Sequence, residues 1–127
     1  MQIVGIAGGM KYRRQKMNKY RNKKVQIDMY VFDSIAESKR YKELVLLQRA
    51  GKISELQLQP KFSLQESFRK KGKTYRKIEY IADFQYEENG KIIVEDVKGK
   101  ETEVFKLKRK LFEKKYPALE LKIIKMK

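Results

Sequence analysis

The spacing of hydrophobic and polar positions changes several times along the chain, and each spacing predicts a type of element. Two stretches have the three-to-four-residue repeat of an amphipathic helix. The first is expected over residues 34–50, because Ser34 followed three residues later by Glu37 is a capping box. The second is expected over residues 102–116, where Pro117 ends it. Both helices are therefore bounded by residues that favour helix ends.

Other stretches alternate between apolar and polar residues, as strands do. Asn89-Gly90 is the strongest short hairpin signal in the chain. Residues 66–77 are rich in Lys and Arg and are interpreted as a basic loop. The expected strands are a short hairpin over 25–32, a strand over 53–64 that bends at Pro60, strands over 75–87 and 91–98, and a last strand over 119–126. The main elements follow in the order α-β-β-β-α-β, which predicts one mixed α/β domain over 25–127 after an arm over 1–24.

The helices are expected to bury one apolar arc each. In the first helix this arc contains Tyr41, Leu44, Val45 and Leu47, and Glu37 lies near its centre. A carboxylate that points to the core is costly unless it is paired or binds a metal, although Glu37 could also serve only as a cap. The arc of the second helix comprises Val104, Phe105, Leu107, Leu111, Phe112 and Tyr116.

The composition narrows the chemistry. The 127 residues include 32 Lys and Arg against 16 Asp and Glu, a formal net charge of +16. This excess favours a polyanionic partner, nucleic acid above all, over a merely well-solvated surface. An apolar content of 41%, with eight Tyr and six Phe, is sufficient for a core. The absence of Cys suits a cytoplasmic protein, and no apolar run reaches membrane-spanning length, so no membrane partner is expected.

The absence of His is the sharpest constraint. Without His or Cys the chain cannot build a zinc finger, a His general base or a His-activated nucleophile. Cleavage of a phosphodiester would have to rely on carboxylates, Lys and a hard divalent cation. Gly72-Lys73-Thr74 resembles the end of a P-loop, but the first glycine of that motif is missing, so nucleotide binding is not expected there.

The positive charge is concentrated in three places that we expect to contact nucleic-acid phosphates. These are the arm, which is either mobile or a helix packed on the body, the 66–77 segment and the outer face of the second helix. The residues are Lys11, Arg13, Arg14, Lys16, Lys19, Arg21, Lys23 and Lys24 in the arm, Arg69, Lys70, Lys71 and Lys73 in the segment, and Lys106, Arg109 and Lys110 in the helix.

A two-residue Asn-Gly loop fixes a strand register. It places Asp83 opposite Asp96, with Cβ atoms about 5 Å apart on one face, unless a bulge intervenes. Lys98 projects from the same face as Asp96, whereas Glu95 should face the other way. Opposed carboxylates destabilise a sheet, so a shared cation is one explanation, and neutralisation by Lys98 on a solvated face is the other.

The arrangement Asp83 followed by Asp96-Val97-Lys98 resembles the signature of the PD-(D/E)xK nuclease superfamily, whose core has the order α-β-β-β-α-β. The chain is also similar over about 18–125 to a small phage and prophage domain family of poorly defined function placed in that superfamily. The likeness is carried by residues 32–34, 59–60, 80–84, 94–99 and 116–117. Ala82 stands where the motif has its Pro.

The resemblance implies a restriction-endonuclease-like core and a DNA endonuclease that uses Mg²⁺ or Mn²⁺. Asp83 and Asp96 would hold the metal, Glu37 would be a direct or water-mediated ligand, and Lys98 would position the attacking water. Gln59 is either a border of this site or a plain strand residue, with the second preferred.

Junction resolution in phage recombination or replication, in a bacterial host cytoplasm, is the specific function that the resemblance suggests, because small basic members of the superfamily resolve Holliday junctions. Such enzymes act as dimers, so a homodimer stays open. The alternatives are a non-catalytic nucleic-acid-binding protein on a degenerate nuclease fold and an RNA-directed nuclease.

Overall fold

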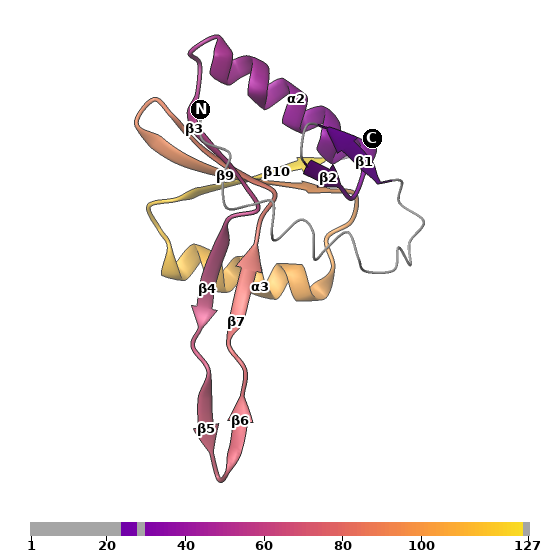
Figure 1. Ribbon diagram of the computed structural model, residues 1–127. Coiled ribbons are helices and arrows are strands. Elements are labelled where there is room, and N and C mark those ends of the chain that lie inside the picture. The colour runs from indigo at the N-terminus through magenta and orange to yellow at the C-terminus, as the bar shows by residue number, and fades with distance from the viewer. Residues whose placement is uncertain (1–23, 28–29, 126–127) are drawn as a thin grey trace.

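A four-stranded sheet between two helices forms the centre of the protein (Figure 1). The computed structural model describes residues 24–27 and 30–125. The sheet order is β10-β9-β8-β3, where the strands are β3 (Ser54–Leu58), β8 (Phe84–Glu88), β9 (Lys91–Lys98) and β10 (Glu120–Lys125). The helices are α2 (Ile35–Arg49) and α3 (Glu103–Lys115). The expected mixture of helices and strands is therefore confirmed.

Strand directions follow the connections. β8 and β9 are antiparallel across the Asn89-Gly90 turn, and both turn residues have a positive φ, 52° and 78°, as a type I′ hairpin requires. β10 pairs with β9 in parallel, because α3 carries the chain back across one face of the sheet. In chain order these elements run α2, β3, β8, β9, α3, β10. Their equivalence to a nuclease core stays a prediction.

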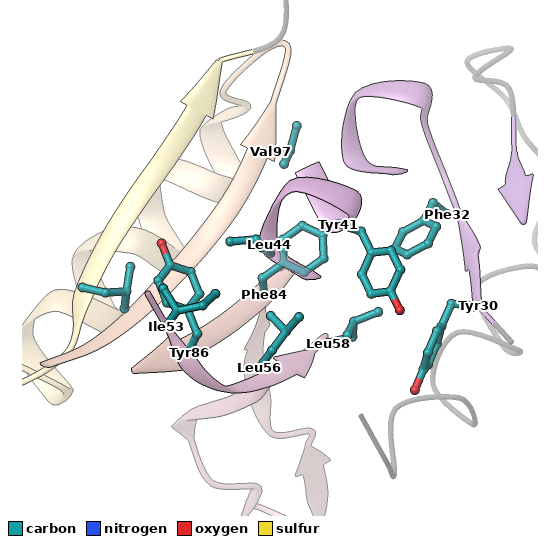
Figure 2. Packing of buried hydrophobic residues seen from close by; sticks show 11 residues of the cluster. Tyr30, Phe32, Tyr41, Leu44, Ile53, Leu56, Leu58, Phe84, Tyr86 and Val97 are labelled. Carbon is teal, nitrogen blue, oxygen red and sulfur yellow. The ribbon is translucent and has the colours of Figure 1, made fainter. Parts of the chain in front are cut away.

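Helix α2 covers one face of the sheet, as Figure 2 shows. Tyr41 and Leu44 from the predicted arc are buried there, against a cluster that includes Phe84 from β8. The short hairpin of β1 (Val25–Ile27) and β2 (Tyr30–Phe32) closes this side, and the ring centroids of Phe32 and Tyr41 are 5.0 Å apart. The expected hairpin over 25–32 is thus confirmed by its pairing.

Helix α3 covers the opposite face through a narrower contact than expected. Phe105 and Phe112 are buried against Val94 and Leu121 of the sheet. Tyr116 packs against this core, but three of the predicted arc residues do not belong to it: Val104, Leu107 and Leu111 are 63%, 59% and 38% exposed. That part of the prediction is wrong. Phe105 and Phe112, at positions i and i+7, lie two turns apart on the one face that contacts the sheet, and the three exposed residues lie on neighbouring faces.

The two helix boundaries are confirmed. The Ser34 hydroxyl accepts a hydrogen bond from the Glu37 backbone N–H at 3.1 Å, and Thr102 caps Phe105 in the same way at 3.1 Å. Gly51, with φ 77°, follows the end of α2. Among the described residues, neither helix has the length and apolar character needed to cross a bilayer.

A long two-stranded arm over residues 61–81, separate from the N-terminal arm expected over 1–24, leaves the body between β3 and β8 (Figure 1). It consists of β4 (Lys61–Gln65) paired with β7 (Ile78–Ile81) and, further out, β5 (Phe68–Lys70) paired with β6 (Lys73–Tyr75). The expectation of a loop over 66–77 is therefore wrong. Thr, Phe and Tyr favour strands, and Lys71 and Gly72 adopt positive φ values of 52° and 77° at the turn, so the segment continues as a hairpin.

Two interruptions in the strands, called strand breaks here, mark where the arm joins the sheet. The predicted bend at Pro60 is confirmed, since β3 ends at Leu58 and β4 begins at Lys61. The single strand expected over 75–87 is wrong, because Ala82 and Asp83 separate β7 from β8. Hydrogen bonds between the breaks hold them together: Gln59 N–H donates to the Asp83 carbonyl at 2.9 Å, and Ala82 N–H to the Pro60 carbonyl at 3.2 Å.

Candidate active site

Asp83 lies at the second break, where the chain passes from the arm into the central sheet. The predicted register is confirmed from the Glu88–Lys91 pair to the Phe84–Glu95 pair, where the ladder ends. Beyond it, the Asp83 N–H donates to the Glu95 carbonyl at 3.0 Å, so Asp83 is not paired with Asp96 in the ladder as expected. The shift of one residue is the irregularity that a strand break allows.

The Asp83 carboxylate nevertheless reaches the strand that carries Asp96. Its Oδ2 accepts a hydrogen bond from the Val97 N–H at 2.7 Å, next to Asp96 in the strand, and the charge of Asp96 acts on it. Both acids are buried. The geometry therefore supports the prediction that these two carboxylates lie on one side of β9. The cause is the strand break at Asp83 and not the predicted pairing in the ladder.

Asp96 is held from two sides. The Tyr80 hydroxyl donates to Asp96 Oδ2 at 2.5 Å, and Lys98 Nζ lies 3.6 Å from Asp96 Oδ1. Lys98 also lies over the ring of Phe105, 4.5 Å from its centroid. Burial, followed by the negative charge of Asp96, raises the pKa of Tyr80, so this phenol stays protonated and donates. Asp96 and Lys98 thus share one face, as their alternation in the sequence predicts.

Glu37 is the third acid of the site. Its backbone N–H completes the α2 cap, but its side chain is buried and acts electrostatically on Asp83. Both roles expected for Glu37, helix cap and metal ligand, therefore stay predictions. Burial raises the pKa of Asp83 well above the usual range, and the charges of Glu37 and Asp96 raise it further, while the Val97 N–H opposes the shift. A bound proton or a cation would relieve this accumulation of negative charge.

The donor set suits a hard divalent cation, since Mg²⁺ and Mn²⁺ prefer carboxylate oxygens. Asp83 and Asp96 are both buried and their charges act on each other, and a bound cation would offset that repulsion. Within residues 24–27 and 30–125, however, no three acidic side chains converge as a ready-made metal site. The assignment of Glu37, Asp83 and Asp96 as metal ligands stays a prediction.

Glu95 faces away from this site, as its position in the strand predicts. It is fully buried on the α2 side, where Arg40 Nε donates to Oε1 at 2.8 Å and Arg40 Nη2 to Oε2 at 2.7 Å. The Tyr86 hydroxyl donates a further short hydrogen bond to Oε2. Glu95 therefore has its charge neutralised by Arg40. Sequence reasoning missed Arg40, and the signal was an acid on a buried face of a strand that needs a cation from the covering helix.

Gln59 borders the site through its backbone. It lies in the break between β3 and β4, it is buried, and it adopts a left-handed φ of 52°, which is unusual for a residue with a side chain. Its N–H bond to the Asp83 carbonyl ties it to the acid. The preferred interpretation of Gln59 as a plain strand residue is therefore wrong.

The basic residues lie on separate surfaces. Arg69, Lys70, Lys71 and Lys73 are exposed at the tip of the arm. On α3, Lys106 lies 3.5 Å from Glu103, and Arg109 lies 3.9 Å from both Glu101 and Glu113, while Lys110 is exposed. Lys24 Nζ lies 3.2 Å from Asp33 Oδ1. The expected contacts at Lys11, Arg13, Arg14, Lys16, Lys19, Arg21 and Lys23 fall outside the described residues.

A family model described as "Protein of unknown function (DUF1064)" matches residues 17–127. No curated protein matches, and no solved structure matches.

Proposed function

The chain belongs to the DUF1064 family, and we propose that it is a metal-dependent DNA endonuclease that hydrolyses phosphodiester bonds. The observation that carries the proposal is the burial of both Asp83 and Asp96, whose charges act on each other, with Lys98 Nζ 3.6 Å from Asp96 Oδ1. Two acids whose charges are forced together, beside a cation, favour a site for a divalent ion over a structural role. Branched DNA, including Holliday junctions met in phage recombination or replication in a bacterial cytoplasm, is the proposed substrate.

Each site residue has a separate task in this proposal. Asp83 and Asp96 would hold Mg²⁺ or Mn²⁺, and Glu37 would contribute directly or through a water. The bound ion would polarise the phosphate and lower the pKa of a water. Lys98 would orient the attacking water and stabilise negative charge on the phosphate oxygens.

Neighbouring groups set the orientation of the two acids. The Val97 N–H fixes Asp83 by donating to Oδ2 at 2.7 Å. The Tyr80 hydroxyl fixes Asp96 by donating to Oδ2 at 2.5 Å, which leaves Asp96 Oδ1 on the side of Lys98. These contacts restrict both carboxylates to one arrangement, so a bound ion would meet oxygens that are already in place.

The net charge of +16 supports a nucleic-acid substrate. Lys and Arg side chains that neutralise phosphates give affinity that falls steeply with salt, and they do so without reading the base sequence. This fits an enzyme that selects the shape of DNA. A homodimer, in which two copies cut the two strands of a symmetric junction, belongs to the same proposal, and its mass in solution tests it.

A second candidate is a non-catalytic nucleic-acid-binding protein on a degenerate nuclease fold. One observation favours it: the described residues hold no converging group of three acids. In this case the basic surfaces would bind nucleic acid, and a bound proton would relieve the repulsion between Asp83 and Asp96.

The deciding experiment measures cleavage of supercoiled plasmid and of four-way junction DNA with Mg²⁺, Mn²⁺ or EDTA. Under the first proposal the wild type cleaves only with metal, and Asp83→Asn and Lys98→Ala each lose about a hundredfold or more in rate, the usual effect of removing one charge-stabilising group. Lys91→Ala, an exposed lysine on the same strand β9, is the matched control and should cleave normally.

Binding without cleavage by the wild type, or equal cleavage by the Asp83 and Lys98 variants, would overturn the catalytic proposal. Junctions made of RNA in the same assay distinguish an RNA-directed nuclease, because phosphate contacts alone do not separate the two sugars.

A further inference from the structure

The outer part of the arm, β5 with β6, extends beyond both hydrophobic cores. All six residues of these two strands are exposed. The outer strands pair as Phe68 with Tyr75, Arg69 with Thr74 and Lys70 with Lys73. Figure 1 shows this pair at the far end of the arm from the sheet. A two-stranded hairpin without a core is marginally stable by itself, so its side chains call for an explanation other than packing.

Cross-strand contacts hold the tip in one conformation. Arg69 Nη1 donates to the Thr74 hydroxyl at 2.9 Å, and Arg69 Nη2 to the Gly72 carbonyl at 3.3 Å. The turn residues Lys71 and Gly72 both lie in the left-handed region, which matches the twist of the flanking strands. These contacts favour one conformation of the tip, which reduces the entropy cost of binding.

Two aromatic rings are stacked at the base of this tip. The ring centroids of Phe68 and Tyr75 are 4.8 Å apart, and their planes are within 8° of parallel. Phe68 and Tyr75 are 44% and 39% exposed and belong to neither buried cluster. Lys73 Nζ lies 5.0 Å from the centre of the Tyr75 ring. Two exposed rings that lie against each other form a contiguous apolar patch, which is a candidate interaction site.

The charge around the rings points to the partner. From Arg69 to Lys73 the sequence is Arg-Lys-Lys-Gly-Lys, with no acid, and Arg76 and Lys77 follow. Lys77 pairs with Glu79 at 3.3 Å, further toward the body. Flat stacked rings bordered by cations match a nucleotide, whose base stacks on an aromatic ring while its phosphate contacts Lys or Arg.

We propose that the outer face of the Phe68 ring, supported from behind by the stacked ring of Tyr75, is a base-stacking site for unpaired nucleotides, with Arg69, Lys70, Lys71 and Lys73 holding the adjacent phosphates. In an intact duplex the base faces are covered by their neighbours, so the rings have no surface to stack on. The arm therefore binds single strands and the opened bases of a fork or junction in preference to duplex. This rests on the nucleic-acid binding in the proposed function and is independent of cleavage.

The first test uses the absence of Trp from the chain. A Phe68→Trp variant has a single Trp, whose fluorescence is quenched when a base stacks on it. Titration in EDTA with a single strand, a fork and a duplex of equal phosphate content should quench the single-strand and fork samples and leave the duplex sample almost unchanged. Leu46→Trp, at an exposed position on α2, is the matched control and should not respond.

The second test measures binding anisotropy with the same three DNAs in EDTA. The double variant Phe68→Leu/Tyr75→Leu should lose about tenfold or more of the preference for single strand over duplex, given the usual contribution of one or two stacked bases. Lys70→Ala/Lys71→Ala should weaken binding to all three DNAs equally and lower the salt dependence of the affinity. Unchanged melting of both variants confirms that the body is folded.

Equal quenching by duplex, an unchanged preference in the aromatic variant, or equal quenching by poly-glutamate would overturn the stacking proposal. The last result would assign the tip to acidic proteins. Because every measurement is made without metal, a failure to cleave DNA leaves this result intact, and loss of stacking leaves the cleavage assay intact.

Discussion

The ion pair between Arg40 and Glu95 gives the sharpest test of how helix α2 is held on strand β9. The Glu95 side chain is 0% exposed and that of Arg40 is 22% exposed, and two hydrogen bonds of 2.8 and 2.7 Å join them. The hydrogen bond to Glu95 raises the pKa of Arg40, with burial acting in the opposite direction, so the guanidinium stays charged. We expect Arg40→Met to destabilise the fold strongly.

The magnitude follows from what the substitution leaves behind. Removing one partner of a buried ion pair usually costs about 3–5 kcal/mol, because the other charge stays buried without compensation. Arg40 is partly accessible to water, so the lower end, about 3 kcal/mol, is expected. For a domain of this size, that corresponds to a fall in Tm of about 10 °C.

Thermal and urea unfolding of the wild type, Arg40→Met, Glu95→Gln and the double variant form a double-mutant cycle. The double variant should be more stable than Arg40→Met alone, because no buried charge remains. Arg49→Met, at an exposed position on the same helix, should change stability by no more than about 0.5 kcal/mol. A loss below about 1 kcal/mol for Arg40→Met, or additive effects in the cycle, would refute the reasoning.

Three further predictions concern the acids and the helix face. The folded-state pKa of Asp83 is raised above the ordinary value of 3.8. Its contribution to stability is therefore complete below pH 3.8 and is lost as the pH rises through the folded pKa. In EDTA, Asp83→Asn should be more stable than the wild type at pH 7, and its free energy of unfolding should fall less with rising pH. Mg²⁺ at about ten times its Kd should stabilise the wild type by about 1.4 kcal/mol and leave Asp83→Asn unchanged, and equal Tm shifts in a thermal melt would argue against the metal site. Leu107→Lys, on the exposed face of α3, should change the free energy of unfolding by no more than about 0.5 kcal/mol, whereas Phe112→Ala should cost about 3–5 kcal/mol in the same urea titration.

Much of the site geometry could be predicted because it depends on local periodicity. Alternation along β9 places Asp96 and Lys98 on one face and Glu95 on the other, and the structure agrees. The Asn89-Gly90 turn fixes the register as far as the Phe84–Glu95 pair. The proximity of Asp83 and Asp96 was predicted from a directly opposed pair within the ladder. In the structure the ladder ends one residue earlier, and Asp83 reaches the strand beside Asp96 from just beyond that end.

Other features of the site could not be predicted, because they depend on which elements pack together. Arg40 neutralises Glu95 across 55 positions of sequence, and no local pattern pairs those two residues. Gln59 and Asp83 meet because both lie at breaks where strands leave the sheet for the arm. Pro60 predicts the first of these breaks, but the break at Ala82 and Asp83 does not follow from the sequence, because the alternation continues through it.

The sequence by itself determined the ends of both helices, the tight turn between β8 and β9, the faces of β9 and the excess of positive charge. These depend on hydrogen bonds and spacings within a few residues. Only the tertiary structure decided that residues 66–77 form an ordered arm, that Val104, Leu107 and Leu111 face outward, and that Glu37 acts on Asp83. An amphipathic pattern states which side chains can be buried, but the shape and size of the opposing surface decide which of them are.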